Sequence, residues 1–246
     1  IGYAIAKGLA AEGASVVITG RGQASVDDAL RRLKEALPDA KAMGIAADCA
    51  TAEGAKLVFD KVPQIDILVN NLGIYGRMPA FEIDDGEWQR FFEVNVMSGV
   101  RFTRHYAPGM AGRGWGRIVF VSSESALNIP REMIHYGMTK TAQLSLSRGF
   151  AMELAGTGVT VNALLPGPTH TENTDRMRAE RAQATGVSVA EIEAGFLRDF
   201  RPTSLIRRFT SSEEVAALGV YLCSEAASGT SGAAMRVDGG VVNQIM

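Results

Sequence analysis

A tyrosine and a lysine at positions i and i+4, Tyr136 and Lys140, form the pair in this sequence best suited to proton transfer. Side chains with this spacing share one face of a helix, and an ammonium group near a phenol favours the phenolate. We therefore expect Lys140 to lower the pKa of Tyr136 from its reference value of roughly 10, so that the phenol can exchange a proton near neutral pH. Tyr3 and Lys7 have the same spacing and are interpreted as an ordinary surface or packing pair.

The surroundings of Tyr136 in the sequence distinguish it from Tyr3. Polar or small residues follow the apolar strands that precede and succeed Tyr136, and they form five clusters: Arg21, Asp48, Asn70-Asn71-Leu72-Gly73, Ser122-Ser123 and Pro166-Gly167. Ligands of open parallel sheets bind beyond the carboxyl ends of the strands. We expect these clusters to meet at one edge of a sheet and to form a ligand site with Tyr136.

The elements that would position these residues alternate between strands and helices. Strands are predicted over 14–19, 41–47, 65–70, 117–121, 159–165 and 234–237, and helices over 1–10, 24–37, 51–62, 87–107, 136–155 and 212–223. Because the strands are apolar on both faces, they predict a doubly wound parallel sheet covered by helices on both sides, in one α/β domain over 1–246.

One stretch departs from this alternation. Residues 170–208 are polar, Arg-rich and of mixed helical pattern, and they follow Pro166-Gly167 directly. Long insertions at strand ends often act as lids over a site, so we expect a substrate lid here. A solvated surface excursion is the alternative interpretation.

The amino-acid composition argues against several classes of protein function. The chain has 25 basic and 27 acidic residues, so its charge points neither to nucleic acid nor to an anionic membrane. No apolar run approaches the roughly 20 residues of a membrane span. Cys49 and Cys223 lie far apart and in no metal-binding pattern, which predicts a cytoplasmic protein without a disulfide or a metal site. Because the chain opens within a helix at Ile1, we also expect residues before it.

Several of these motifs, together with Asn95, jointly resemble the short-chain dehydrogenase/reductase family: Asn70-Asn71-Leu72-Gly73, Ser123, Tyr136-x-x-x-Lys140 and Pro166-Gly167. The resemblance extends to Val237-Asp238-Gly239-Gly240. Ile1-Gly2 match the end of the family's TGxxxGIG dinucleotide turn, whereas Leu72 replaces the usual Ala. The resemblance implies a Rossmann-type domain and an NAD(P)-dependent oxidoreductase that interconverts a carbonyl and a secondary alcohol, similar to 3-oxoacyl-[acyl-carrier-protein] reductases.

The same resemblance implies a catalytic tetrad of Asn95, Ser123, Tyr136 and Lys140. Tyr136 would give a proton to the carbonyl oxygen, and Ser123 would stabilise the developing negative charge on that oxygen with a hydrogen bond. Lys140 would hold the nicotinamide ribose. Asn95 would position a water molecule that links Lys140 to solvent as a proton relay. Strand capping by Ser123 and helix packing by Asn95 are the alternatives.

The cofactor contacts implied by the resemblance lie along the same edge. Besides Tyr136 and Lys140, they are Ile1, Arg21, Asp48, Cys49, Asn71, Leu72, Gly73, Pro166, Gly167, Thr169 and Thr171. Asp48 would accept from the adenine amino group, and Thr171 holds the position expected to contact the carboxamide, although both threonines could be turn residues. Gly20 stands where NAD enzymes usually carry an acid, and Arg21 could pair with a 2′-phosphate. NADP is therefore favoured over NAD.

Two alternatives to an oxidoreductase follow from the fold. A non-catalytic dinucleotide-binding regulatory protein could share it, but the complete tetrad argues against that function. An epimerase or dehydratase would need a larger C-terminal domain than the residues after Gly167 provide.

The substrate stays open at this point. Thioester, sugar, polyol and steroid oxidoreductases share these motifs, and the lid arginines Arg176, Arg178, Arg181 and Arg201 fit either an anionic substrate or a solvated helix. The resemblance also implies a homotetramer or dimer, for which Leu144, Ala151 and Leu154 provide a candidate apolar face.

Overall fold

The computed structural model describes residues 1–245 as one α/β domain built on parallel strands. In one part of the sheet β1 (Val16–Gly20) pairs with β2 (Ala42–Ala46). The other part has the order β3-β4-β5-β6, formed by Ile67–Asn70, Gly116–Val121, Val159–Pro166 and Ala234–Val237. Each strand before β6 is followed by a helical crossover, and the predicted α/β fold class is confirmed.

Helices cover the sheet on both faces because successive residues of β4 point in opposite directions. Ile118 and Phe120 pack with α5 (Ser98–Arg113) and α6 (Ile134–Glu153), and this cluster includes the buried Leu154. Leu154 therefore belongs to the core of its own chain, so its assignment to a surface between subunits was wrong.

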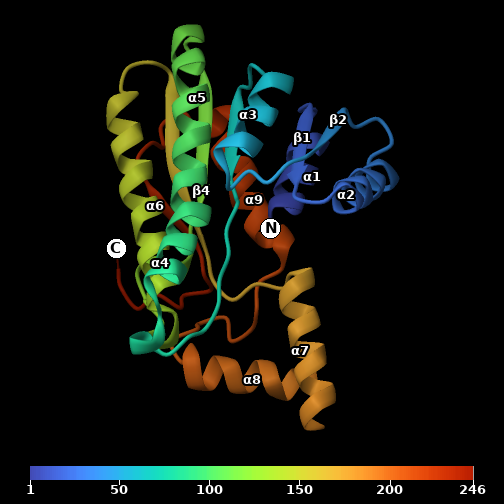
Figure 1. The fold of residues 1–246 in the computed structure, drawn as a ribbon, viewed down its shortest axis with the longest axis vertical. Helices are drawn as coiled ribbons and strands as arrows, with labels where there is room; N and C mark the ends of the chain where they lie inside the picture. The colour runs from blue at the N-terminus through green and yellow to red at the C-terminus, as the bar shows by residue number, and fades with distance from the viewer. Residues whose placement is uncertain (246) are drawn as a thin grey trace.

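The opposite face of β4 carries a second cluster. Val119 and Val121 pack there with Ile5 of α1 (Gly2–Ala11) and with α9 (Ser212–Cys223). The two clusters sandwich the sheet in three layers, as Figure 1 shows for α5 and α6 on one side and α9 on the other. The remaining crossovers are α2 (Gln23–Ala36) and α3 (Ala52–Lys61).

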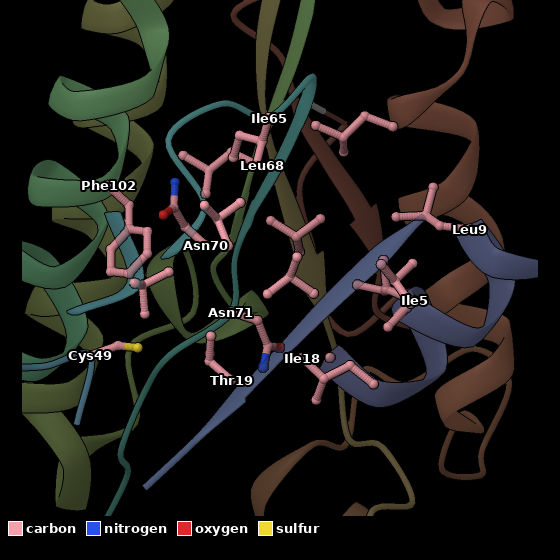
Figure 2. A pocket seen from close by; sticks show the side chains of 18 of the residues that line it. Ile5, Leu9, Ile18, Thr19, Cys49, Ile65, Leu68, Asn70, Asn71 and Phe102 are labelled. Atoms are coloured by element: carbon pink, nitrogen blue, oxygen red, sulfur yellow. The ribbon is translucent and has the colours of Figure 1, made fainter. Parts of the chain in front are cut away.

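A groove separates the two parts of the sheet. It has a volume of about 810 Å³ and lies between the facing edges of β1 and β3, lined by apolar side chains such as Ile5, Ile18 and Leu68 (Figure 2). Such a space between two parallel edges suits one further strand. The expectation that residues precede Ile1 stays a prediction.

The helix predicted over 87–107 has a more complex structure. It comprises α4 (Asp85–Phe92), a π-helical turn at Glu93–Met97, and then α5. Residue Asp84 caps α4 by accepting from the amide of Glu87 at 2.8 Å. A π turn inserts one extra residue into the helical ladder and re-aims the side chains within it, here Asn95.

The excursion predicted over 170–208 forms α7 (Glu172–Thr185) and α8 (Val189–Phe200). Both helices begin with a capping box, from Thr171 and Ser188 respectively. Figure 1 shows the pair standing apart from the three layers, beyond the ends of the strands. Their position is suitable for a lid, which is taken up below.

Candidate active site

The carboxyl end of β4 and the first turn of α6 bring Ser123 and Tyr136 together. Ser123 lies two residues beyond the end of β4, and its hydroxyl accepts from the Ser125 amide at 3.1 Å. Tyr136 is half-buried. Burial raises the pKa of Tyr136 to about 12, and a hydrogen bond with Ser123 opposes that rise. The effect of Ser123 on the Tyr136 pKa places the two side chains close together at the sheet edge.

Lys140 lies beneath this pair, buried in the interior. Its Nζ is 5.6 Å from the centroid of the Tyr136 ring and donates to the carbonyl oxygen of Val121 at 3.0 Å and to Oε1 of Gln143 at 3.2 Å. Burial lowers the pKa of Lys140 to about 7. The expected lowering of the Tyr136 pKa by Lys140 is wrong in this structure, because burial of the phenol has the largest effect and the main opposing contribution comes from Ser123.

Asn95 is fully buried and joins three segments of the chain. Its Oδ1 accepts from the amide of Ile74 at 2.7 Å, and its Nδ2 donates to the Ile74 carbonyl at 3.0 Å and to Oγ1 of Thr139 at 2.9 Å. The Asn95 carbonyl accepts from Nε2 of Gln143 at 2.6 Å. The side chain thus fixes the loop after β3 against α6, and its backbone connects through Gln143 to Lys140.

Sequence reasoning missed Gln143. Its signal was available, because residues three apart on a helix are neighbours and Gln143 follows Lys140 by that spacing. The structure therefore brings Asn95, Ser123, Tyr136 and Lys140 into one cluster and adds Gln143 to it.

The cofactor-site candidates are distributed along the same edge. Arg21 is exposed directly after β1, and Asp48 is exposed after β2 with its carboxylate accepting from the Ala50 amide at 3.1 Å. Leu72 packs against the cluster that contains Cys49. Cys49, Asn71 and Leu72 also line the groove between the two parts of the sheet, where Figure 2 shows the Asn71 side chain near Thr19.

Two glycines make close approaches that fit a bound nicotinamide dinucleotide. A Cβ on Gly73 would lie 3.3 Å from Lys140 Nζ and 3.5 Å from Asn95 Oδ1, so the bare backbone leaves space beside the lysine. A Cβ on Gly167 would lie 2.6 Å from the carbonyl oxygen of Asp238, which no side chain could occupy. Gly73 therefore leaves room beside Lys140, whereas Gly167 packs directly against the backbone of Asp238.

Two threonine candidates use their hydroxyl groups locally. Thr169 is buried, donates to the Gly167 carbonyl at 2.8 Å and lies 2.9 Å from the Thr210 hydroxyl. Thr171 caps α7 by accepting from the Thr174 amide. These contacts are those of turn residues, and a cofactor role for either threonine stays a prediction.

The excursion contacts the site at two points. Arg201, just after α8, donates to Glu124 Oε1 at 2.9 and 2.7 Å, and both side chains are buried. Tyr75 accepts from Asn173 of α7 at 2.6 Å, and its ring lies 6.4 Å from that of Tyr136. These contacts join both helices of the excursion to residues beside Ser123 and Tyr136.

Two of the excursion's arginines are already neutralised within the chain. Arg178 pairs with Asp175 and, at 3.0 Å, with Glu193, while Arg201 pairs with Glu124. The suggestion that these two arginines recruit an anionic substrate was therefore wrong. Within residues 1–245, no helix is long and apolar enough to cross a membrane, and no group of His, Cys, Asp or Glu side chains is arranged to hold a metal ion.

Comparison with known proteins extends over nearly the whole chain. Residues 1–242 match the family model described as enoyl-(acyl carrier protein) reductase. The chain is 45% identical over 245 residues to the uncharacterized oxidoreductase YvaG of Bacillus subtilis, covering 100% of this chain and 93% of that protein. It is 36% identical over 251 residues to dehydrogenase/reductase SDR family member 4 of Caenorhabditis elegans, covering 98% and 90% of the two chains.

A solved structure agrees with these sequence matches. The L-sorbose reductase of Gluconobacter frateurii, complexed with NADPH and L-sorbose, superimposes with a TM-score of 0.91 at 33% identity. The match covers 99% of this chain and 93% of that one.

Proposed function

This chain belongs to the short-chain dehydrogenase/reductase family, and on that premise we propose that it reduces a ketone to a secondary alcohol with Tyr136 as the proton donor. The observation that carries this proposal is the convergence of Ser123, Tyr136 and Lys140 at the carboxyl edge of the sheet, with Lys140 Nζ 5.6 Å from the Tyr136 ring centroid. A pKa of about 12 keeps the phenol protonated at neutral pH, which suits a general acid better than a general base.

Each residue of the cluster has a separate role in the proposed reaction. Tyr136 donates its proton to the substrate oxygen as negative charge develops there, and Ser123 donates a hydrogen bond to the same oxygen. Lys140 would hold the ribose hydroxyls of the nicotinamide nucleotide, beside the open backbone of Gly73. The bound nucleotide supplies the hydride. Asn95 holds the Ile74 loop and α6 in register, so that these groups converge.

The cofactor proposed is NADP, with NAD as the alternative. Gly20 at the end of β1 provides no carboxylate for a ribose diol, and the exposed Arg21 beside it can pair with a 2′-phosphate. The NADPH complex of the related L-sorbose reductase supports this choice. The nucleotide would extend along the strand ends from Arg21 and Asp48 to Pro166 and Gly167.

Two substrate classes deserve direct comparison. The description of the family model names an acyl carrier protein and so supports an acyl thioester, whereas the structural match supports a keto sugar or polyol. We propose that residues 170–208 act as the substrate lid, since Arg201 and Asn173 fasten both of its helices beside the site. We also propose a cytoplasmic homo-oligomer, a tetramer or dimer, as the resemblance implies.

The test is NADPH oxidation with a panel of ketones that includes an acetoacetyl thioester and L-sorbose, comparing wild type with Tyr136→Phe. We expect the variant to bind NADPH normally and to turn over about 100-fold more slowly, the scale of lost general acid catalysis. Nucleotide binding without turnover in the wild type would instead indicate a regulatory protein. Near-normal turnover by Tyr136→Phe would remove Tyr136 from its role.

A further inference from the structure

The side-chain amide of Gln143 bridges two members of the proposed tetrad. Its Oε1 accepts from Lys140 Nζ at 3.2 Å, and its Nε2 donates to the carbonyl oxygen of Asn95 at 2.6 Å. All three residues are buried, with Gln143 only 1% exposed. The amide therefore spans the space between the lysine and the Asn95 backbone, where the family resemblance led us to expect a water molecule.

An amide and a water molecule behave differently at this position. A water molecule can accept a proton on one side and release another on the opposite side, so it can carry protons between neighbours. A neutral carboxamide has a fixed acceptor and a fixed donor and is not a titrating group in the range of protein function. The contact between Lys140 and Asn95 through Gln143 is thus a structural link that orients the ammonium group.

We propose that Gln143 is a positioning residue of the reductase reaction, which holds the Lys140 ammonium group in place. The inference rests on the proposed function. Two of the three hydrogens on Lys140 Nζ are used by Gln143 and by the Val121 carbonyl, and these contacts direct the remaining one. Lys140 Nζ also passes close to Gly73, the side on which the nucleotide ribose is proposed to bind.

The electrostatic surroundings of Lys140 are simple, which makes the effect of Gln143 measurable. The titratable side chain facing Lys140 is Tyr136, 5.6 Å from Nζ to the ring centroid, and burial is the cause of the lysine's lowered pKa. A hydrogen-bond acceptor stabilises the charged form of an ammonium group. Gln143→Leu, which removes the acceptor, should lower the Lys140 pKa further, whereas Gln143→Glu, which adds a negative charge, should raise it.

The experiment measures the Lys140 pKa directly in nucleotide-free protein carrying ¹³C-labelled lysine, by NMR titration. The chain contains six lysines, so the Lys140 resonance can be assigned with a Lys140→Arg variant. The same proteins are then assayed for the pH profile of ketone reduction. We expect opposite shifts of the pKa in the two Gln143 variants, matching shifts of the alkaline limb of kcat/KM, and a fall in kcat of about 10-fold or more for Gln143→Leu.

Ser147→Ala is the matched control, because Ser147 is also buried on α6, one turn beyond Gln143 and outside the cluster. It should leave the Lys140 pKa and the pH profile unchanged. If the Lys140 resonance titrates identically in wild type and both Gln143 variants, the proposal is overturned. If Gln143→Leu fails to fold, the Lys140 pKa of the Gln143→Glu variant, which preserves side-chain size, tests the proposal by itself. Absence of reduction by the wild type would refute the proposed function instead, and the NMR titration would still test Gln143.

Discussion

Arg201 donates two hydrogen bonds to one carboxylate oxygen of Glu124, at 2.9 and 2.7 Å, in a buried contact between the end of the excursion over 170–208 and the residue that follows Ser123. Burial raises the pKa of Glu124, and Arg201 opposes that rise. The second oxygen of Glu124 is buried and has no hydrogen-bond partner among the described residues. The Glu124 carboxylate therefore depends on Arg201 for charge compensation, and this ion pair joins the excursion over residues 170–208 to the segment after β4.

Arg201→Leu should be strongly destabilising, because it leaves the Glu124 carboxylate buried without its partner. Removing one member of a buried pair costs about 3–5 kcal/mol, whereas replacing both charges can be nearly neutral. We expect the double variant Glu124→Gln, Arg201→Leu to recover much of the loss in free energy of unfolding, measured by urea denaturation. Arg198→Leu removes an exposed ion pair from α8 and should change the free energy of unfolding little. Equal losses in the single and double variants would contradict the dependence described here.

Arg21 should determine the preference for NADP. A charge-assisted hydrogen bond contributes about 1.5–3 kcal/mol, so Arg21→Ala should weaken NADPH binding about 10- to 100-fold and leave NADH binding nearly unchanged. Isothermal titration with both nucleotides measures the two dissociation constants. Lys34→Ala removes a positive charge from the exposed face of α2 and should alter neither. An equal weakening of both nucleotides would show that Arg21 does not contact the 2′-phosphate.

Burial of Lys140 should make stability depend on pH. Its pKa in the folded protein is about 7, against 10.5 for a free lysine, so between these values the unfolded chain binds more protons than the folded one. The free energy of unfolding should therefore rise with pH over this interval, by up to about 1.4 kcal/mol per pH unit from this group, and the destabilisation should be complete below the folded pKa.

The Lys140→Met variant should not show this rise in the free energy of unfolding with pH. Urea denaturation of both proteins at pH 7 and pH 9 measures it, and the difference between them removes the contribution of other titrating groups. A wild type that gains no stability over the variant between these pH values would show that the ammonium group is better solvated than its burial indicates.

The sequence predicted the fold and most of the candidate site because both follow from local patterns. Apolar strands separated by helices imply a parallel sheet, and parallel strands bring Ser123 and Asn71 to one edge. The π-helical turn around Asn95 was not predictable, since the apolar pattern of 87–107 continues through it and only contacts with Ile74 and Thr139 define the bulge.

The pKa shifts of the site were harder to predict from the sequence than the residues that make up the site. Helical spacing placed Lys140 beside Tyr136, but spacing does not reveal how deeply each group is buried. Burial depends on the packing of α6 against β4, which involves residues distant in sequence. Burial determines the direction of both pKa shifts, and it reversed the expected one for Tyr136. The ion pairs that neutralise Arg178 and Arg201 likewise depend on acidic partners, Glu193 and Glu124, that only the fold brings close.

Gly73 should be essential for nucleotide binding although it lies in an exposed loop. Its backbone does not have the positive φ that favours glycine, so alanine can adopt the same conformation. The added Cβ would lie 3.3 Å from Lys140 Nζ, on the side where the ribose is proposed to bind. Gly73→Ala should therefore fold normally but bind NADPH about 10-fold more weakly, a loss of about 1.4 kcal/mol.

Gly76→Ala is the matched control in the same loop, since a Cβ there would meet only the Phe91 ring at 3.9 Å, an ordinary contact. Fluorescence titration with NADPH and thermal unfolding of both variants separate binding from stability. If Gly73→Ala binds NADPH as tightly as Gly76→Ala, the nucleotide does not pass between Gly73 and Lys140. In that case Lys140 would have to reach the ribose from another side, and the contacts that Gln143 and Val121 make with its ammonium group would point away from the cofactor.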